Sequence, residues 1–241
     1  MELPGAVAIV TGGAVRLGRA MSLGLAQAGA RVVVHYGHSA DAAHDTVAAI
    51  EALGGEAIAV QADLVGSAVA PAVVGRGAER FGHVDVLVNS ASIFEPVGIA
   101  DTTESLWDRH FAINLRAPFF LCRAFVGQLG DRRGHIVNIA DWRGAHPTAS
   151  GVTYTLTKAG LIAMTQALAQ SLAPNVQVNA IAPGVILPPP GEGDEYVERL
   201  LPSIPLRRSG SPADVVDALL YLLRSDYVTG EILHVTGGQH L

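Results

Sequence analysis

The chain has 241 residues, of which 49% are hydrophobic and 16% are charged, and its formal net charge is −6. This much apolar material fills a large core and excludes a disordered chain, while the negative charge argues against a nucleic-acid-binding surface. Aromatic residues make up only 5%, so Ala, Val, Leu and Ile must build the core, as in buried parallel strands covered by helices.

Apolar runs with β-branched residues alternate with longer amphipathic segments along the whole chain. The runs predict strands at Val7–Thr11, Arg31–Tyr36, Ala57–Gln61, Val84–Val88, His135–Ile139, Val176–Ile181 and Glu231–Val235. The segments between them predict helices at Leu17–Ala28, Asp41–Leu53, Ala68–Phe81, Glu104–Gln128, Tyr154–Leu172 and Pro212–Leu223. This alternation predicts a single α/β domain over residues 1–241, with a Rossmann-like, doubly wound parallel sheet and helices on both faces.

Two proline-containing segments depart from this regular pattern. Pro118 lies inside the longest predicted helix and should kink it, because proline removes a backbone donor. Pro183–Pro202 is too long for an ordinary connection and leaves the carboxyl end of a predicted strand. We interpret this segment as a substrate-binding lid, and the alternative is a surface excursion without a role.

The cysteine and histidine content bears on compartment and metals. Cys122 is the only cysteine, which excludes an internal disulfide and argues against a cysteine-based metal cluster. His110, His135, His234 and His240 do not have metal-ligand spacing, so we expect no metal. The first residues lack the features of a signal peptide, and no stretch predicts a membrane span, so we expect a cytoplasmic protein.

A glycine-containing turn follows the first predicted strand, between Thr11 and Gly18. Such a turn lets the backbone approach a pyrophosphate, and the N-terminus of the next helix favours the negative charge. The spacing is not GxGxxG, since Gly12 is followed by Arg16, Leu17 and then Gly18. Arginine can hold phosphate oxygens through two donors, so we predict a dinucleotide site formed by these four residues.

The end of the second predicted strand indicates which dinucleotide binds. It lacks the acidic residue that usually holds the ribose of NAD, and His38 and Ser39 stand there instead. With Arg16, these side chains can receive a 2′-phosphate, so NADP(H) is favoured over NAD. The alternative is that His38 is an ordinary turn residue and Ser39 an ordinary helix cap.

Tyr154 and Lys158 lie four residues apart at the start of a predicted helix, which puts both on one face. A free tyrosine has a pKa of about 10, and a nearby ammonium stabilises the phenolate and lowers that pKa. The pair can therefore exchange a proton with a substrate while a hydride moves, which predicts an oxidoreductase.

These motifs together resemble the short-chain dehydrogenase/reductase family over almost the whole chain. The matching motifs are Thr11–Gly18, Ala62-Asp63-Leu64, Asn89-Ser90-Ala91-Ser92, Asn114, Tyr154 with Lys158, and Pro183-Gly184. The resemblance implies that Asn114 completes a proton relay through water with the tyrosine and lysine. It also implies a homotetramer and a set of cofactor contacts from Asp63, Leu64, Asn89, Ala91, Pro183, Gly184 and Ile186.

Two residues depart from the usual family pattern. Asp141 occupies the position thirteen residues before the tyrosine, where serine is usual, and Arg16 replaces the middle glycine of the first loop. Both departures resemble the pteridine reductase branch, although His38 stands where arginine is commoner. Phe94 resembles the aromatic residue of that branch that stacks on the pterin, and a phenyl face suits a flat ring.

The resemblance to this branch implies NADPH-dependent reduction of a C=N bond in a pterin or folate-like substrate, with protonation assisted by the tyrosine. A carboxylate can accept hydrogen bonds from the amino group of a pterin, whereas a serine hydroxyl suits a ketone oxygen. The implied substrate contacts are Arg16, Ser92, Phe94, Asp141, Tyr154 and Leu187. The alternative function is a carbonyl reductase acting on a 3-oxoacyl or other ketone, and a remote alternative is a noncatalytic NADP-binding regulator.

Several candidate residues keep a second interpretation. Asp141 can instead cap local backbone donors as a turn residue, and Phe94 can be a packing residue. Ser150 lies four residues before the tyrosine and is a weak candidate for a displaced catalytic serine. Three further residues have two interpretations, as lining of the substrate pocket or as structural residues, and these are Trp142, His146 and Tyr196.

Overall fold

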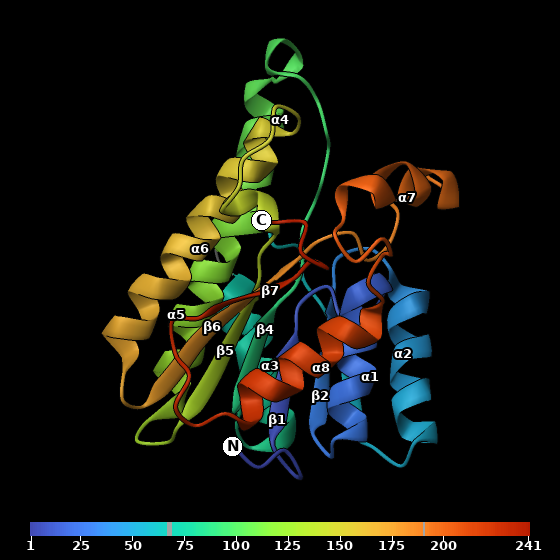
Figure 1. The fold of residues 1–241 in the computed structure, drawn as a ribbon. Coiled ribbons are helices and arrows are strands. Elements are labelled where there is room, and N and C mark those ends of the chain that lie inside the picture. Colours follow the sequence, from blue (N-terminus) through green and yellow to red (C-terminus); the bar gives the residue numbers. More distant parts are fainter. Residues whose placement is uncertain (67–68, 190) are drawn as a thin grey trace.

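The computed structural model describes residues 1–66, 69–189 and 191–241, and these form a seven-stranded parallel sheet (Figure 1). The strands are β1 (Val7–Val10), β2 (Arg31–Tyr36), β3 (Ala57–Gln61), β4 (Val86–Asn89), β5 (Gly134–Ile139), β6 (Val176–Pro183) and β7 (Ile232–Val235). Their order is β3-β2-β1-β4-β5-β6-β7, so the direction of winding reverses between β1 and β4. Open parallel sheets bind ligands in the crevice at such a reversal, beyond the carboxyl ends of the strands.

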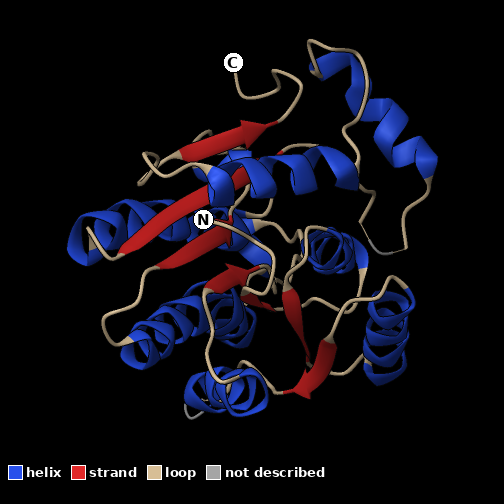
Figure 2. Cartoon of the chain, turned by 90° about the horizontal axis from the view of Figure 1, so that it is seen from below, coloured by secondary structure: helices blue, strands red, loops and turns tan. Residues whose placement is uncertain are grey.

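Helices cover both faces of the sheet, as the predicted fold class requires (Figure 2). One face packs against α1 (Arg16–Gln27), α2 (Ala40–Ala52) and α8 (Pro212–Arg224), and the other packs against α3 (Val69–Phe81), α5 (Ala117–Leu129) and α6 (Val152–Leu172). Alternate residues of β1 enter the two cores, because side chains point to opposite faces along a strand. The α/β prediction is confirmed, and Ala68, the predicted start of the third helix, lies outside the described residues.

The long predicted helix Glu104–Gln128 is interrupted by a π-helical turn. It consists of α4 (Glu104–Phe111), a π-helical turn (Ala112–Arg116) and α5. Pro118 lies at the start of α5, two residues after this turn, so the interruption falls beside the proline at which the sequence predicts a kink. The irregular turn contains Asn114, a buried residue of the predicted site.

The predicted lid is more ordered than expected. It contains α7 (Asp194–Leu200) and a short 3₁₀ turn (Leu201–Ser203), whereas the sequence predicts an irregular segment. Asp194 and Glu195 lie in the first turn of α7, where negative charge interacts favourably with the helix dipole. Pro190, which belongs to the predicted lid, lies outside the described residues. In the part of the chain that is described, no helix is both long and apolar enough to cross a membrane.

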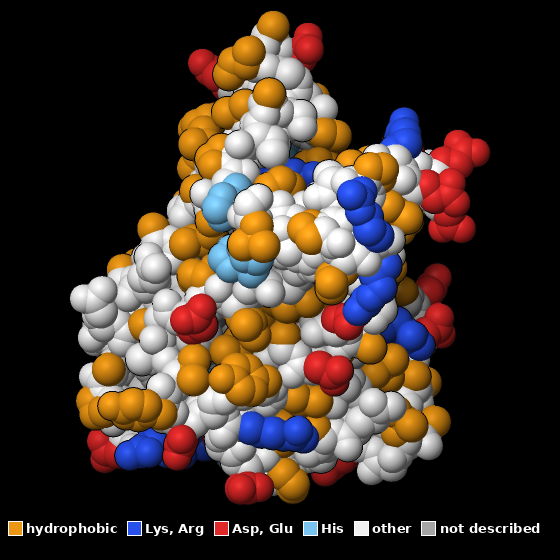
Figure 3. Space-filling view, in the orientation of Figure 1, with side chains coloured by type: hydrophobic (Ala, Val, Ile, Leu, Met, Phe, Trp, Pro, Cys, Tyr) orange, Lys and Arg blue, Asp and Glu red, His pale blue; other side chains and the backbone are white. Residues whose placement is uncertain are grey.

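Three histidines that are distant in sequence meet near the C-terminus. The rings of His234 and His240 stack with their centroids 4.3 Å apart, and His146 lies 6.2 Å and 6.1 Å from them. Histidine side chains gather on this face of the molecule in Figure 3. Burial and the two neighbouring histidines lower the pKa of His234. Among the described residues, no group of side chains has the arrangement needed to hold a metal ion.

Candidate active site

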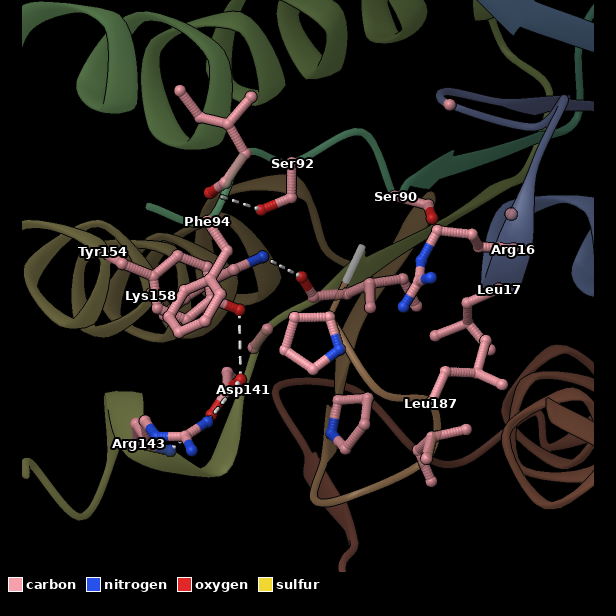
Figure 4. Close-up of a pocket in the computed structure, with 18 of the residues that line it drawn as sticks. Arg16, Leu17, Ser90, Ser92, Phe94, Asp141, Arg143, Tyr154, Lys158 and Leu187 are labelled. Atoms are coloured by element: carbon pink, nitrogen blue, oxygen red, sulfur yellow. Dashed lines mark hydrogen bonds and ion pairs between the residues drawn. The ribbon is translucent and has the colours of Figure 1, made fainter. Parts of the chain in front are cut away.

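A cavity of about 570 Å³ opens at the carboxyl ends of the central strands (Figure 4). The loops after β1, β4, β5 and β6 line it, together with α6, and Tyr196 and Leu200 of α7 close one side. It gathers most of the predicted site residues, namely Gly12, Arg16, Leu17, Gly18, Ala91, Ser92, Phe94, Asp141, Tyr154, Lys158, Pro183, Gly184, Ile186 and Leu187. In the described structure, the cavity is not lined by the other predicted site residues, which are His38, Ser39, Asp63, Leu64, Asn89 and Asn114.

The loop after β1 is built around glycines that leave no room for a side chain. Gly12 has a φ of +63°, and a Cβ atom there would lie 3.0 Å from the Cα of Ala91. A Cβ atom on Gly18 would lie 2.0 Å from the carbonyl oxygen of Gly12. Thr11 Oγ1 accepts hydrogen bonds from the backbone of Ser90 (2.9 Å) and Ala91 (3.1 Å), which joins this loop to the one after β4.

The N-terminus of α1 faces the cavity with its backbone donors available. Val15 occupies the cap position and, in the described structure, provides no side-chain hydrogen bond to the first turn. No acidic side chain lies in this turn either. Free N–H groups at a helix N-terminus bind phosphate groups, so the loop fits a dinucleotide pyrophosphate.

Arg16 connects the phosphate loop to the segment that follows β6. Its backbone is left-handed, with a φ of +52°, which is uncommon for a residue other than glycine. Its Nη2 donates a hydrogen bond to the carbonyl oxygen of Pro188, 2.5 Å away. Arg16 therefore lines the cavity, as predicted, and also makes a contact with the predicted lid that the sequence does not indicate.

The residues expected at the adenosine end lie outside the cavity lining, and all except Leu64 are exposed. His38 and Ser39 are exposed after β2, and the side chain of Ser39 accepts no capping hydrogen bond from the described backbone of α2. Leu64 is buried, while Asp63 is exposed and its Oδ1 accepts a hydrogen bond from the backbone of Val65 at 3.0 Å. The site at the end of β2 is thus open and carries no acidic side chain until Asp41.

Asn89 ends β4 beneath the cavity and carries a free acceptor. Its Nδ2 donates to the Oδ1 of Asn138 at 2.9 Å and lies 3.4 Å from the Sγ of Cys122. Its own Oδ1 is buried without a hydrogen-bond partner among the described residues. Buried polar atoms are rarely left unpaired, so this oxygen fits a site that a ligand or water completes.

The loop after β5 brings Asp141 into contact with Tyr154. The phenol oxygen donates a hydrogen bond to Oδ2 of Asp141 at 3.0 Å, while Oδ1 accepts one from the backbone of Arg143 at 2.8 Å. The Arg143 guanidinium also lies 3.5 Å from Oδ2. Asp141 is therefore both a local cap and a cavity residue, so its two interpretations do not exclude each other. Arg143 was not predicted, because its role depends on a contact between neighbours in the loop.

The electrostatic environment of Tyr154 differs from the sequence-based expectation. Burial raises its pKa well above 10, and the charge of Asp141 and the hydrogen bond to it raise the pKa further. The expectation that Lys158 lowers this pKa is wrong for the described structure, in which the carboxylate is closer to the phenol. The Lys158 Nζ lies 5.5 Å from the phenol ring centroid and donates to the carbonyl oxygen of Ile139 at 2.7 Å.

Lys158 is itself perturbed by its surroundings. It is only 3% exposed, and burial lowers its pKa from 10.5 to about 8 although the charge of Asp141 opposes this change. Tyr154 and Lys158 lie one helical turn apart in α6, but their pKa values move in opposite directions. Both shifts favour the neutral form, because burial disfavours charge on either side chain.

Phe94 lies over Tyr154 at the wall of the cavity. The two ring centroids are 4.8 Å apart at an interplanar angle of 71°, which is an edge-to-face contact. Ser92 is exposed in the same segment, and Leu187 lines the cavity from the segment after β6. Ser150 is exposed and is not among the described lining residues, so the structure does not bring it to the site.

Asn114 holds the Phe94 segment from the π-helical turn. Its Oδ1 accepts from the backbone of Ile93 at 2.9 Å, and its Nδ2 donates to the Ile93 carbonyl oxygen at 3.0 Å. Nδ2 also lies 3.3 Å from Oγ1 of Thr157, between Tyr154 and Lys158 on α6. The side chain of Asn114 thus joins two neighbouring segments, and the relay through water to the lysine stays a prediction.

Comparisons with known proteins place this architecture among oxidoreductases. The profile described as Enoyl-(Acyl carrier protein) reductase matches residues 13–240. The chain is 34% identical to the 3-oxoacyl-[acyl-carrier-protein] reductase FabG of Staphylococcus aureus, over 97% of this chain and 98% of that one. It is also 36% identical to FolM Alternative dihydrofolate reductase 1 from Brucella canis, whose crystal structure contains NADP. That structure covers 99% of this chain and 95% of its own, with a TM-score of 0.94.

Proposed function

Because the chain belongs to the short-chain dehydrogenase/reductase family, we propose that it uses NADPH to reduce a C=N bond in a pterin or dihydrofolate-type substrate. The coarser assignment, an NADP(H)-dependent oxidoreductase, follows from the family and from its NADP-bound structural relatives. The single observation that carries the finer assignment is the Asp141 carboxylate, hydrogen bonded to Tyr154 at 3.0 Å where most relatives in the family use serine.

The described residues fit NADP(H) as the cofactor. Gly12 and Gly18 let the backbone approach the pyrophosphate, and the uncapped α1 N-terminus would bind it. The exposed His38 and Ser39 would hold the 2′-phosphate, and the unpaired Asn89 oxygen would accept a bond near the nicotinamide half. When bound, the reduced cofactor supplies the hydride for the ring carbon.

The cavity side chains would orient the substrate and supply the proton. The Asp141 carboxylate would accept hydrogen bonds from the amino group and ring N–H of a pterin, and Arg143 would keep that carboxylate in place. Phe94 would offer its ring as an apolar wall beside the flat substrate. Tyr154 retains its proton at neutral pH because its pKa is raised, although the same shift makes the phenol a weaker acid. Tyr154 would pass this proton to the ring nitrogen as the hydride reaches the ring carbon.

The decisive experiment follows NADPH oxidation with a dihydropterin, dihydrofolate and a 3-oxoacyl thioester as separate substrates. We expect turnover with a pterin or folate, and we expect Asp141→Ser to lower kcat/KM for it by about 10- to 100-fold, because a charged hydrogen bond is lost. Ser150→Ala is the matched control, since Ser150 lies outside the cavity lining. Good turnover of the thioester without turnover of any pterin would refute the proposal.

A carbonyl reductase is the second candidate function, and the FabG relatives are the observation that favours it. The granaticin polyketide synthase putative ketoacyl reductase 2 of Streptomyces violaceoruber is also 34% identical, over 98% of this chain and 96% of that one. In that case Asp141→Ser should raise ketone turnover. A noncatalytic NADP-binding regulator would show no loss of any measured activity in Tyr154→Phe.

We also propose that the enzyme is a homotetramer in the cytoplasm. Apolar side chains lie exposed on α4 and α5, including Trp107 (40% exposed) and Phe119 (45% exposed). Phe119 lines a groove between α4, α5 and α6 that a second copy of the chain would fill. Light scattering should give a tetramer for the native chain and a smaller species for Phe119→Glu. A native monomer would contradict this part of the proposal.

A further inference from the structure

His35 lies in β2, outside the cavity lining, yet it contacts two segments of the cofactor site. It is 1% exposed, and its Nδ1 accepts a hydrogen bond from the backbone of Gly12 at 3.2 Å. Its Nε2 lies 3.0 Å from the carbonyl oxygen of Ala62. Its own carbonyl oxygen accepts a bond from the backbone of Gly13 at 2.9 Å. One residue thus binds the phosphate loop twice and the segment after β3 once.

These partners determine the state of the ring. Gly12 offers an N–H group, so Nδ1 must present its lone pair, and Ala62 offers a carbonyl oxygen, so Nε2 must carry the proton. The ring is therefore neutral and has a single tautomer. Burial lowers the pKa of His35, which keeps the ring neutral at physiological pH.

The strand order explains why this position reaches both segments. β2 lies between β1 and β3, so a side chain at its carboxyl end stands between the loops that follow its two neighbours. Gly12 begins the phosphate loop with a positive φ, and its N–H group needs an acceptor that the sheet does not supply. Ala62 immediately precedes Asp63, a residue predicted to contact the cofactor.

We propose that His35 is a positioning residue of the cofactor site, whose ring sets the distance between the phosphate loop and the segment that carries Asp63. This inference rests on NADP(H) as the cofactor, but it does not depend on whether the substrate is a pterin or a ketone. An apolar or charged side chain in its place would leave at least one of the two backbone groups unpaired.

Two amide substitutions separate the two halves of this bridge. The Asn amide in His35→Asn reaches only the position of Nδ1 and keeps an acceptor for Gly12. The Gln amide in His35→Gln reaches the position of Nε2, so it keeps a donor for Ala62 and loses the Gly12 bond. The dissociation constant of NADPH, measured by fluorescence titration without substrate, should rise on the order of tenfold in the Gln variant and less in the Asn variant.

His44→Gln is the matched control, because His44 is exposed on α2 and makes the same chemical change. It should bind NADPH as the native chain does. An affinity of the Gln variant within about twofold of this control would overturn the proposal. Thermal unfolding of each cofactor-free variant identifies a general loss of folding, which would weaken NADPH binding for a different reason.

A second measurement on the native chain keeps the proposal testable if the variants do not fold. Nitrogen NMR of the His35 ring should show a neutral ring with the proton on Nε2. A proton on Nδ1, or a charged ring at neutral pH, would overturn the bridge. Failure of the native chain to bind NADPH would instead refute the proposed function, so the two failures are distinguishable.

Discussion

The loops after β1 and β5 border the same cavity, but different interactions hold them. The β1 loop depends on backbone geometry, since Gly12 and Gly18 allow contacts that any Cβ atom would prevent. The β5 loop depends on side-chain charge, since Asp141 is held by Arg143 and in turn holds Tyr154. A single substitution in the first arrangement therefore creates a steric clash, whereas one in the second changes the charge beside Tyr154.

Tyr154→Phe should have the largest effect and should affect only the β5 side of the cavity. It removes the proposed proton donor, so kcat should fall by roughly 10²- to 10⁴-fold. The phenyl ring keeps the contact with Phe94, so the dissociation constant of NADPH should stay within about twofold of the native value. Steady-state kinetics and a binding titration measure the two quantities, and parallel losses in both would contradict the separation of the loops.

Gly18→Ala tests the β1 side in the same way. The loop must move to accept a Cβ atom 2.0 Å from the Gly12 oxygen. We expect NADPH to bind about 100-fold more weakly, which corresponds to about 3 kcal/mol of binding free energy. Gly75→Ala in α3 is the control, because no described atom lies within 4 Å of the added carbon. The control should be stabilised by about 0.5–1 kcal/mol in thermal unfolding. Equal binding by both variants would show that the loop tolerates a side chain.

Lys158→Met should change how stability depends on pH. The native lysine has a pKa of about 8 when folded and 10.5 when unfolded, so the unfolded chain binds more protons between these values and stability rises with pH there. Methionine removes this dependence. We subtract the free energy of unfolding of the native chain from that of the variant at each pH. This difference should be up to about 3 kcal/mol larger at pH 7 than at pH 10.5. Denaturant unfolding at both pH values measures it, and parallel stability curves would contradict it.

Asp141→Asn tests how much the charge of the β5 loop contributes to the raised pKa of Tyr154. The carboxylate contributes to the raised pKa of Tyr154, so the neutral amide should lower that pKa toward its usual value. Ultraviolet titration of the phenolate, with Tyr154→Phe as the reference, measures the change in the cofactor-free chain. An unchanged titration would mean that burial alone sets the pKa of this tyrosine.

His38→Arg should have the smallest effect, on the cofactor side. A guanidinium at this exposed position can form additional bonds to a 2′-phosphate, so the preference for NADPH over NADH should rise by about fivefold. The ratio of the two dissociation constants measures this preference. A ratio that does not change would place the 2′-phosphate away from His38.

The β1 loop could be predicted from sequence because its requirements are local. Glycines between a strand and a helix have few other uses, and the spacing of Tyr154 and Lys158 survives in any regular helix. The parallel sheet likewise follows from the alternation of apolar runs and amphipathic segments.

The β5 loop could be predicted only in part, because its properties arise from contacts between segments. Asp141 was identified by its position, but its closeness to the phenol reverses the expected pKa shift of Tyr154. The sequence predicts an interruption at Pro118, but it does not indicate that the interruption is a π-helical turn that contains Asn114. The bridge formed by His35 depends on which strands are neighbours, and one strand alone does not reveal this.

The buried Cys122 has a practical consequence for spectroscopy. Burial raises the pKa of its thiol to about 12, so the thiol stays protonated and out of reach of maleimide reagents in the folded protein. A cysteine introduced at an exposed position of α7, such as Glu198, would then be the site that reacts. A single fluorescent or spin label there would test whether the predicted lid responds to cofactor and substrate, without removal of the native thiol.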